Sequence, residues 1–333
     1  MDSFTVTPED DGARLQDFLA ARYPTVSVGA LRKLMSQGNV LINGTIGTRN
    51  MTLHAGHTID VDADASDLPA ALPRKMDFDV LYEDEWCVVI NKPAGLAVVP
   101  EREAEEYPLM EGMLYYLQHA SPFATGEMVR PMIVHRLDKD TTGALLIAKS
   151  ITALRDFSEQ FARRTVQKEY LAIVRGRPPR EAELSFPLTA KGARAGRILV
   201  NHHYGRPAVT RITTEEYFDG YALVRAMPLT GRTHQVRVHL MASGYPLAVD
   251  PLYSGRPSRT TLLLPELKRG YRPKRDQEER PLIARQALHA HRLTFNTRSV
   301  DTINRVRVEA PLPHDMQVVL KMLRKYRPQR ESE

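Results

Sequence analysis

Runs of apolar residues bounded by polar and turn-forming residues cover most of the chain from residue 78 onward. Such runs predict β-strands, which we expect at residues 78–82, 86–91, 144–148, 168–175, 208–217, 221–228, 289–295 and 303–309. Apolar residues at helical spacing predict helices near residues 109–120, 150–163, 233–242 and 313–326. Because the strands are grouped with few helices between them, we predict an α+β fold with a mixed, largely antiparallel sheet.

The first sixty residues show a different pattern, in which two helical segments precede two short strands. The segment "ARLQDFLAARYP" ends in a proline, and "SVGALRKLMSQG" has Ser27 as its N-cap and Gly38 as its stop. A strand then leads into an Asn43–Gly44 turn, and "GHTIDVDAD" forms the next strand. We predict a small α+β domain over residues 1–61.

Changes in composition indicate where the other domains begin and end. Residues 62–75, "DADASDLPAALPRK", are rich in Ala, Asp and Pro and have no helical or strand period, which is typical of a linker. We therefore expect a main domain over residues 76–326 and a short C-terminal tail over 327–333. The charged stretch 256–281 is punctuated by prolines and is expected to lie on the surface.

Composition is typical of a soluble globular protein, since 42% of the 333 residues are hydrophobic and 26% are charged. The single cysteine, Cys87, leaves no disulfide framework, which favours a reducing compartment. The N-terminus lacks the pattern of a signal peptide, and no apolar stretch approaches the roughly 20 residues that span a bilayer. We expect a cytoplasmic protein that does not insert into membranes.

Positive charge is concentrated in two stretches of the chain. The net charge is +6, but residues 163–211 hold 11 Lys and Arg against 3 Glu, and residues 255–333 hold 18 against 9 acids. Local excess of this kind is typical of a protein that binds a phosphate backbone. A solvated basic surface has the same composition, so charge alone leaves both interpretations open.

Common cofactor and metal motifs are absent from the sequence. It contains neither a G-x-x-x-x-G-K-[ST] nor a G-x-G-x-x-G segment, and one cysteine cannot form a thiolate zinc site. His289 and His291 share one face of a predicted strand and could bind a metal, but hydrogen bonding within the sheet is the expected role. No serine nucleophile elbow is found, so a cofactor-free reaction carried by a carboxylate remains.

The segment "HRLDKDTTG" offers the best candidate carboxylate, Asp138. Asp140 fits a turn before the next strand. A carboxylate nucleophile must stay ionised while partly stripped of water, and burial alone favours its protonated form. It therefore needs a fixed cation, for which arginine is suited because its guanidinium stays charged. Arg136, Arg232 and Arg237 are candidates that sequence spacing does not separate.

Several long segments resemble the RluA-type pseudouridine synthases, the ribosomal large-subunit family. The segments that carry the resemblance occur in the family's order: "NKPAGLAVVP", "VHRLDKDTTGALLIAK", "KEYLAIVRG", "LTGRTHQVRVHLMASGYPLAVDPLYSG" and "RQALHAHRL". The resemblance implies a pseudouridine synthase fold and a reaction without cofactor. It implies Asp138 as the catalytic carboxylate, Tyr170 as the aromatic residue that packs on the target base, and Arg232 as the cation that pairs with Asp138.

The same resemblance implies substrate contacts by three other residues. Leu288 would form an apolar wall of the base pocket, His135 would shape the catalytic loop, and Arg136 would also contact the flipped nucleotide. Lys139 and Thr142 stand where the family commonly has Arg and Ser.

The N-terminal segments "RLQDFLA" and "GNVLINGT" resemble the ribosomal S-four-type RNA-binding domain, also called the alpha-L motif. The resemblance implies RNA contacts by basic residues such as Arg32 and Lys33. One departure reduces the charge, since Ser27-Val28-Gly29 replaces the Ser-Arg pair that often opens the second helix.

Together these features predict an RNA pseudouridine synthase that acts on large-subunit ribosomal RNA, or alternatively on transfer RNA. We expect a monomer. Two other classes remain as alternatives: a non-catalytic RNA-binding or ribosome-assembly factor on the same fold, and a hydrolase of small glycosyl substrates. The second usually requires two catalytic carboxylates and would leave the basic stretches unexplained.

Overall fold

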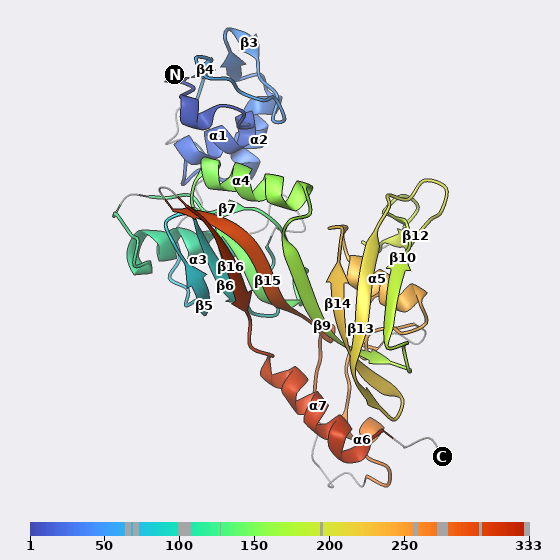
Figure 1. The fold of residues 1–333 in the computed structure, drawn as a ribbon. Helices are drawn as coiled ribbons and strands as arrows, with labels where there is room; N and C mark the ends of the chain where they lie inside the picture. The colour runs from blue at the N-terminus through green and yellow to red at the C-terminus, as the bar shows by residue number, and fades with distance from the viewer. Residues whose placement is uncertain are drawn as a thin grey trace.

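The structure is a computed structural model in which a small N-terminal domain packs on a larger domain built around one long, curved sheet (Figure 1). It describes residues 1–63, 68, 73–98, 108–126, 128–193, 196–255, 259–271, 279–299 and 302–329. The expected linker, residues 62–75, lies mostly outside the described residues, as do residues 330–333 of the expected tail.

The N-terminal domain combines a sheet of order β1-β4-β2-β3 with two helices. Its elements are β1 (Asp2–Thr5), α1 (Leu15–Arg22), α2 (Val28–Ser36), β2 (Val40–Ile42), β3 (Thr45–Ile46) and β4 (Thr58–Val61). The Ser27 side chain accepts a hydrogen bond from the backbone N–H of Ala30, so the predicted N-cap is confirmed. Strand β1 was not predicted from the sequence, and it pairs antiparallel with β4.

The main sheet has the strand order β10-β13-β14-β9-β15-β8-β6-β5, with β16 paired to β15 and β7 paired to β8. Its strands are β5 (Val80–Glu83), β6 (Cys87–Lys92), β7 (Met132–Ile133), β8 (Thr142–Ala148), β9 (Gln167–Arg175), β10 (Glu181–Ser185), β13 (Val209–Phe218), β14 (Tyr221–Pro228), β15 (Leu288–Ser299) and β16 (Thr302–Glu309). A separate pair is formed by β11 (Leu188–Thr189) and β12 (Leu199–Val200). Strand pairs are antiparallel except β15 with β8, which is parallel, so the predicted mixed, largely antiparallel α+β fold is confirmed.

The central strands are apolar because helices cover the sheet on both faces. In β6, Val88 and Ile90 belong to the core under α3 (Pro108–Tyr115), whereas Cys87 and Val89 belong to the core under α4 (Ile151–Ala162). Alternate side chains of a strand point to opposite faces, so a strand covered twice must be apolar at every position. This explains the continuous apolar run of β8, whose residues are all buried.

Two further helices cover the other half of the sheet. Helix α5 (Gln235–Ala242) packs near β10, β12, β13 and β14, and α7 (His314–Tyr326) inserts Met316, Val319, Leu320 and Leu323 into a separate core. In Figure 1, α4 and the N-terminal domain lie over the left half of the sheet, and α5 lies beside the right half. The end of α4 and the start of α5 both reach the junction of the two halves, where the cavity described below is found.

The N-terminal domain is docked through a shared core and one buried arginine. The core under α4 continues into the small domain and includes Phe18, Leu31, Phe157 and Phe295. Arg130, which is buried, donates from Nη1 to three backbone carbonyls after α1, those of Tyr23, Pro24 and Val26, at 3.1, 3.0 and 2.6 Å.

The stretch 256–281, expected on the surface, contributes to the core where it is described. It contains the short helix α6 (Leu264–Leu267), and the side chains of Leu262 and Leu267 are fully buried against α7. Arg327, assigned above to the tail, donates to the backbone carbonyls of Glu266 and Leu267. No helix in the described ranges is long and apolar enough to cross a membrane.

Candidate active site

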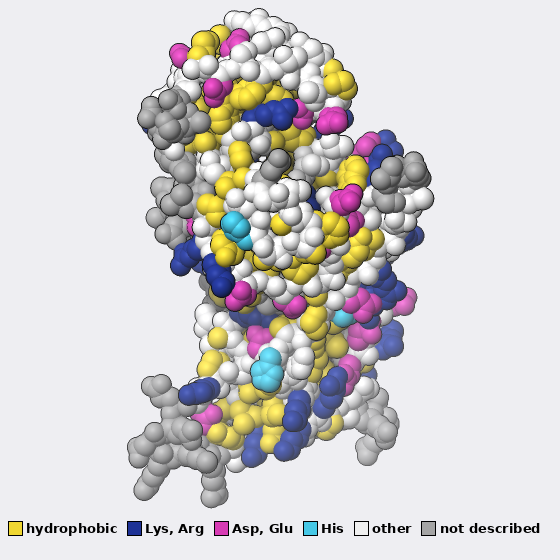
Figure 2. Space-filling view, turned by 90° about the vertical axis from the view of Figure 1, so that its left-hand side faces the viewer, with side chains coloured by type: hydrophobic (Ala, Val, Ile, Leu, Met, Phe, Trp, Pro, Cys, Tyr) yellow, Lys and Arg dark blue, Asp and Glu magenta, His cyan; other side chains and the backbone are white. Residues whose placement is uncertain are grey.

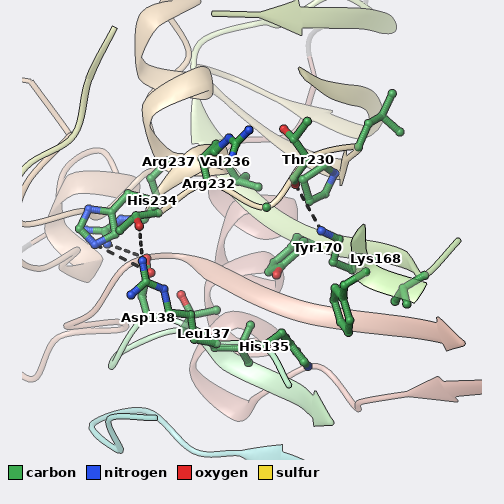
Figure 3. Close-up of a pocket in the computed structure, with 18 of the residues that line it drawn as sticks. His135, Leu137, Asp138, Lys168, Tyr170, Thr230, Arg232, His234, Val236 and Arg237 are labelled. Atoms are coloured by element: carbon green, nitrogen blue, oxygen red, sulfur yellow. Dashed lines mark hydrogen bonds and ion pairs between the residues drawn. The ribbon is translucent and has the colours of Figure 1, made fainter. Parts of the chain in front are cut away.

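A cavity of about 470 Å³ opens where the loop before β8, the end of α4, β9, and the loop between β14 and α5 meet (Figure 3). Its lining includes six of the eight predicted site residues: His135, Arg136, Asp138, Tyr170, Arg232 and Leu288. These residues come from segments more than 150 positions apart in the sequence, and the sheet brings them together.

The loop that carries Asp138 is held by groups from distant parts of the chain. The backbone N–H of Thr141 donates to the Asp138 carbonyl at 3.0 Å, which closes a turn directly before β8. The buried ammonium of Lys92 donates to the Lys139 carbonyl at 2.8 Å and also to the carbonyls of Pro93 and Leu96. The "NKP" segment of the sequence thus fixes the loop that carries Asp138 without lining the cavity.

On the other side, the residues before β15 support the same loop. Arg285 donates to the carbonyl of Asp140, and the Gln286 amide donates to Thr141 Oγ1 at 2.6 Å. Contacts of this kind hold the loop in one conformation, so the position of Asp138 is set before a ligand binds.

Asp138 is paired with Arg237, not with Arg232. Arg237 Nη1 lies 2.7 Å from Asp138 Oδ2. The other edge of the guanidinium binds Asp250 at two points, Nε to Oδ2 at 2.7 Å and Nη2 to Oδ1 at 2.8 Å. Asp250 is fully buried, and its Oδ1 also accepts hydrogen bonds from the backbone N–H groups of Leu252 and Tyr253. We call Asp138, Arg237 and Asp250 the cavity triad.

Electrostatics favour the charged form of Arg237. Burial acts to lower the pKa of Arg237, but its hydrogen bonds to Asp250 and the charges of Asp250 and Asp138 raise that pKa above the ordinary value. Asp250 therefore neutralises and orients the buried cation, while Nη1 remains directed at Asp138. The Asp138 side chain is 24% exposed, so its carboxylate stays accessible from the cavity.

The predicted pairing of Arg232 with Asp138 is wrong. Arg232 lies in the exposed turn before α5, and its Nε donates weakly to the carbonyl of Pro207 at 3.4 Å. Figure 3 shows its side chain directed away from Asp138. The turn is fixed by Gln235, whose Oε1 accepts from Arg232 N and from Thr230 Oγ1. Arg237 lies on the helix, where it contacts both Asp138 and the buried Asp250.

A histidine lies near the carboxylate oxygen of Asp138 that Arg237 does not contact. His234 Nε2 is 3.8 Å from Asp138 Oδ1, and its Nδ1 lies 2.8 Å from the hydroxyl of Tyr253. Burial lowers the pKa of His234 and outweighs the opposing effect of the Asp138 charge. His234 adopts a left-handed backbone conformation, with φ of 53°, which bends the chain into α5.

Tyr170 and Leu288 form the wall of the cavity beside Asp138. They come from the adjacent strands β9 and β15, and Leu288 is 3% exposed. Burial, with a smaller contribution from the Asp138 charge, raises the pKa of Tyr170, so its hydroxyl is neutral at physiological pH. An aromatic ring in this position offers a flat surface on which a base can stack.

His135 and Arg136 occupy the loop before Asp138 and differ in role. His135 Nε2 accepts a hydrogen bond from the backbone N–H of Leu146 at 3.0 Å, and its ring stacks on Phe161. Burial, together with the charge of Lys168, lowers the pKa of His135 to about 3, so the ring is neutral and supports the loop. Arg136 is exposed at the cavity and donates to the hydroxyl of Thr233.

The other two predicted site residues lie outside the cavity. Arg32 and Lys33 are on α2 of the N-terminal domain, where Arg32 Nε donates to Gln16 Oε1 and Lys33 is exposed. His289 and His291 form hydrogen bonds within the sheet region, as predicted: His289 with Thr142 and with the carbonyl of Ala310, and His291 with that same carbonyl.

Many basic residues of the positively charged stretches pair with acids. Examples are Arg163 with Glu159, Arg211 with Glu183, and Arg324 with Glu216. Figure 2 shows Lys and Arg side chains mixed with Asp and Glu across the middle of the face that it presents. The charge excess seen in the sequence is therefore partly neutralised in the fold.

Asp250 and Lys168 were not predicted from the sequence, and Arg232 was predicted as the partner of Asp138 in place of Arg237. One signal could have identified Arg237: it lies within the run "QVRVHL", where the flanking apolar residues indicate burial. A buried arginine requires a carboxylate partner, whereas Arg232 lies in the polar turn "TGRT". Asp250, which follows the apolar run "PLAV", had the appearance of a turn residue.

The chain is also similar in sequence to known proteins. Residues 87–242 match the family model described as RNA pseudouridylate synthase. Ribosomal large subunit pseudouridine synthase D of Neisseria meningitidis serogroup B is 33% identical over 324 residues, 96% of this chain and 81% of that protein. The protein of the same name from Escherichia coli K12 is 31% identical over 328 residues, 96% of this chain and 93% of that protein.

The fold is also found among solved structures. The structure titled human RNA pseudouridylate synthase domain containing 4 superimposes with a TM-score of 0.54 at 23% identity, covering 74% of this chain and 92% of that one. The resemblance found in the sequence motifs is confirmed by relatives that match nearly the whole chain. The chain belongs to the RNA pseudouridylate synthase family.

Proposed function

We propose that this protein isomerises specific uridines to pseudouridine in large-subunit ribosomal RNA. The observation that carries the proposal is the cavity triad, in which a buried, neutralised Arg237 is aimed at an accessible Asp138 beside Tyr170 and Leu288. The names of the relatives support ribosomal RNA as the substrate. Transfer RNA is the second substrate to test.

Asp138 would react with the ribose of an everted uridine. A carboxylate can add to the anomeric carbon or remove a sugar proton, and either step separates the uracil from the sugar. The uracil then turns and forms a carbon–carbon bond through its carbon 5. Arg237 would hold the Asp138 carboxylate in position during these steps, because its Nη1 lies 2.7 Å from Asp138 Oδ2.

Other residues would bind the nucleotide rather than react with it. Extruding a base from a stack costs a few kcal/mol, which stacking on Tyr170 and contact with Leu288 would offset. The exposed Arg136 would contact the flipped nucleotide at the cavity mouth. Arg32 and Lys33 would contact RNA from the N-terminal domain. Arg232 would contribute a positive charge at the protein surface near the bound RNA. We expect the protein to act as a cytoplasmic monomer and to need no cofactor.

The most informative experiment maps pseudouridines by chemical probing of RNA from cells that carry wild-type protein, Asp138→Asn, or no protein. We expect pseudouridine at one or more uridines only with the wild type. With purified protein and a ribosomal RNA fragment, Asp138→Asn should lower the rate at least about 1,000-fold, as expected for loss of a nucleophile. RNA affinity should stay within about threefold, because the phosphate contacts that dominate affinity remain.

Two outcomes would contradict the proposal. Identical pseudouridine maps with and without the protein, together with tight RNA binding, would favour the non-catalytic RNA-binding factor. Release of free uracil by the wild type would favour a glycosyl hydrolase instead.

A further inference from the structure

Lys168 is a cation in the cavity wall that the roles assigned above do not use. Its Nζ donates to the backbone carbonyl of Thr230 at 3.2 Å and lies 5.8 Å from the centre of the Phe161 ring. No Asp or Glu in the described ranges lies within ion-pair distance of this ammonium. An ammonium has three N–H donors, so two of them remain for a ligand in the cavity.

The geometry of β9 sets the position of Lys168 relative to Tyr170. Lys168 and Tyr170 are two residues apart on β9, so they point to the same face and are about 7 Å apart. Figure 3 shows Tyr170 between Asp138 and Lys168.

This order matches the order of groups in a nucleotide. If the ribose reacts at Asp138 and the uracil stacks on Tyr170, the carbonyl edge of the base extends toward Lys168. Both uracil carbonyl oxygens accept hydrogen bonds, and they gain negative charge when the base separates from the sugar. The turn at residues 229–231, whose Thr230 carbonyl holds the Lys168 ammonium, forms the adjoining wall.

We propose that Lys168 is a catalytic residue that donates a hydrogen bond to a uracil carbonyl oxygen and stabilises the base as an anion. The inference rests on the proposed function and adds a second charge to its mechanism. Arg237 and Asp138 would act on the sugar, and Lys168 would act on the leaving base.

The step balances in atoms and electrons. When the bond between N1 and the anomeric carbon breaks, its electron pair stays with the uracil and spreads over N1, O2, O4 and carbon 5. The Lys168 proton remains on nitrogen and only strengthens its hydrogen bond to oxygen. An electron pair from carbon 5 then forms the bond to the anomeric carbon, while Asp138 either leaves that carbon or returns the sugar proton that it removed. Carbon 5 loses its proton and N1 gains one, so the product is an isomer of the substrate. Nothing is oxidised or reduced.

The first test compares Lys168→Met, which removes the charge, with Lys168→Arg, which keeps it. On an RNA that the wild type modifies, Lys168→Met should lower the single-turnover rate about 100- to 1,000-fold, the usual cost of losing one oxyanion donor. Lys168→Arg should retain at least about a tenth of the wild-type single-turnover rate. The RNA dissociation constant and its salt dependence should not change, whereas loss of a phosphate contact would weaken binding and reduce the salt slope.

The second test uses the pH dependence of kcat/KM. Burial lowers the pKa of Lys168 to about 8. The ammonium form is the active one, so wild-type kcat/KM should fall as pH rises above about 8, because this constant reports groups of the free enzyme. Lys168→Arg should lack this fall, since a guanidinium stays charged at that pH.

The third test separates catalysis from a structural role. The substrate is RNA with 5-fluorouridine at the target position. Fluorine stabilises the anion of this base, so breaking its bond to the sugar should depend less on Lys168. Consumption of the nucleoside is measured by mass spectrometry after digestion of the RNA. The wild-type rate divided by the Lys168→Met rate should be several-fold smaller with 5-fluorouridine than with uridine. A damaged fold would leave the ratio unchanged.

The outcomes distinguish this inference from the proposed function. If the wild type forms pseudouridine and Lys168→Met is equally fast, or the fluorinated substrate gives the same ratio, the inference is wrong and the proposed function stands. If the wild type forms no pseudouridine in any RNA, both are wrong.

Discussion

The two faces of β9 carry charged networks that differ in their exposure to solvent. On one face, Lys168 and Tyr170 border the cavity, which Asp138 and Arg237 of the triad also line. Within the triad, Arg237 is 4% and Asp250 is 0% exposed. Because side chains alternate along a strand, Glu169 points to the other face. There it binds Arg225 and Arg292, which also bind Glu215 and the more exposed Glu309.

The difference in burial separates the network to which we propose a catalytic role from one that holds strands together. Partly exposed ion pairs contribute about 0 to 1 kcal/mol, because water screens them and can replace either partner. In a buried pair, removing one partner leaves an uncompensated charge and costs about 3 to 5 kcal/mol. The triad therefore fixes the direction of Arg237, whereas the Glu169 network cross-links β9, β14 and β15.

Asp250→Asn should have the largest effect of the changes that break this comparison. It keeps the size of the side chain but places an amide where Arg237 and two backbone N–H groups require a carboxylate. We expect the free energy of unfolding to fall by about 3 kcal/mol in urea titrations. The single-turnover rate on RNA should fall at least about 100-fold, because Arg237 loses its orientation toward Asp138.

Glu169→Gln is the matched control, since it makes the same chemical change on the other face of β9. It should cost about 1 kcal/mol or less and leave the rate within about threefold. Equal losses in the two variants would show that burial does not distinguish the networks.

Lowering the pH should have smaller effects on the stability of the fold. Burial lowers the pKa of His289, which supports the start of β8, to about 4 from an ordinary value of 6.5. The unfolded chain therefore binds the extra proton first, and stability should fall as pH decreases from 6.5 to 4. Although burial acts to raise the pKa of Glu169, hydrogen bonds to Arg292 and Arg225 lower it below 4.5, so its contribution is lost only as pH decreases below 4.5.

Urea unfolding at pH 7.5, 5.5 and 4.5 measures these contributions. Between pH 7.5 and 5.5, Glu169→Gln should lose stability in parallel with the wild type, whereas His289→Gln should lose less. If His289→Gln shows the same pH slope as the wild type, the neutral buried histidine is not a source of acid sensitivity.

The sequence was sufficient to predict the central strands and helices because their apolar residues follow strand or helical spacing. Strands β1 and β10 were missed, since "DSFT" and "EAELS" are polar edge segments that form strands only because β4 and β13 pair with them. The surface assignment for residues 256–281 was wrong for Leu262 and Leu267, because the helix that buries them, α7, lies some fifty residues further along the chain.

The candidate site was predicted in part for the same reason. Asp138, Tyr170 and Leu288 lie in motifs long enough to be found in the sequence, and the structure places all three in the cavity lining. The partner of Asp138 depends on how α5 is rotated, which is decided by packing against β13, β14 and Asp250. Arg232 lies in the turn before α5, so the packing of the helix brings Arg237, and not Arg232, to the carboxylates.

A direct measurement of the central claim compares Arg237→Gln with Arg232→Gln in single-turnover reactions on the same RNA. Both changes remove one positive charge from the same segment, so they match in net charge and differ in position. We expect Arg237→Gln to lower the rate at least about 100-fold, while Arg232→Gln stays within about fivefold of the wild type. Near-normal turnover by Arg237→Gln together with a collapse in Arg232→Gln would contradict this expectation.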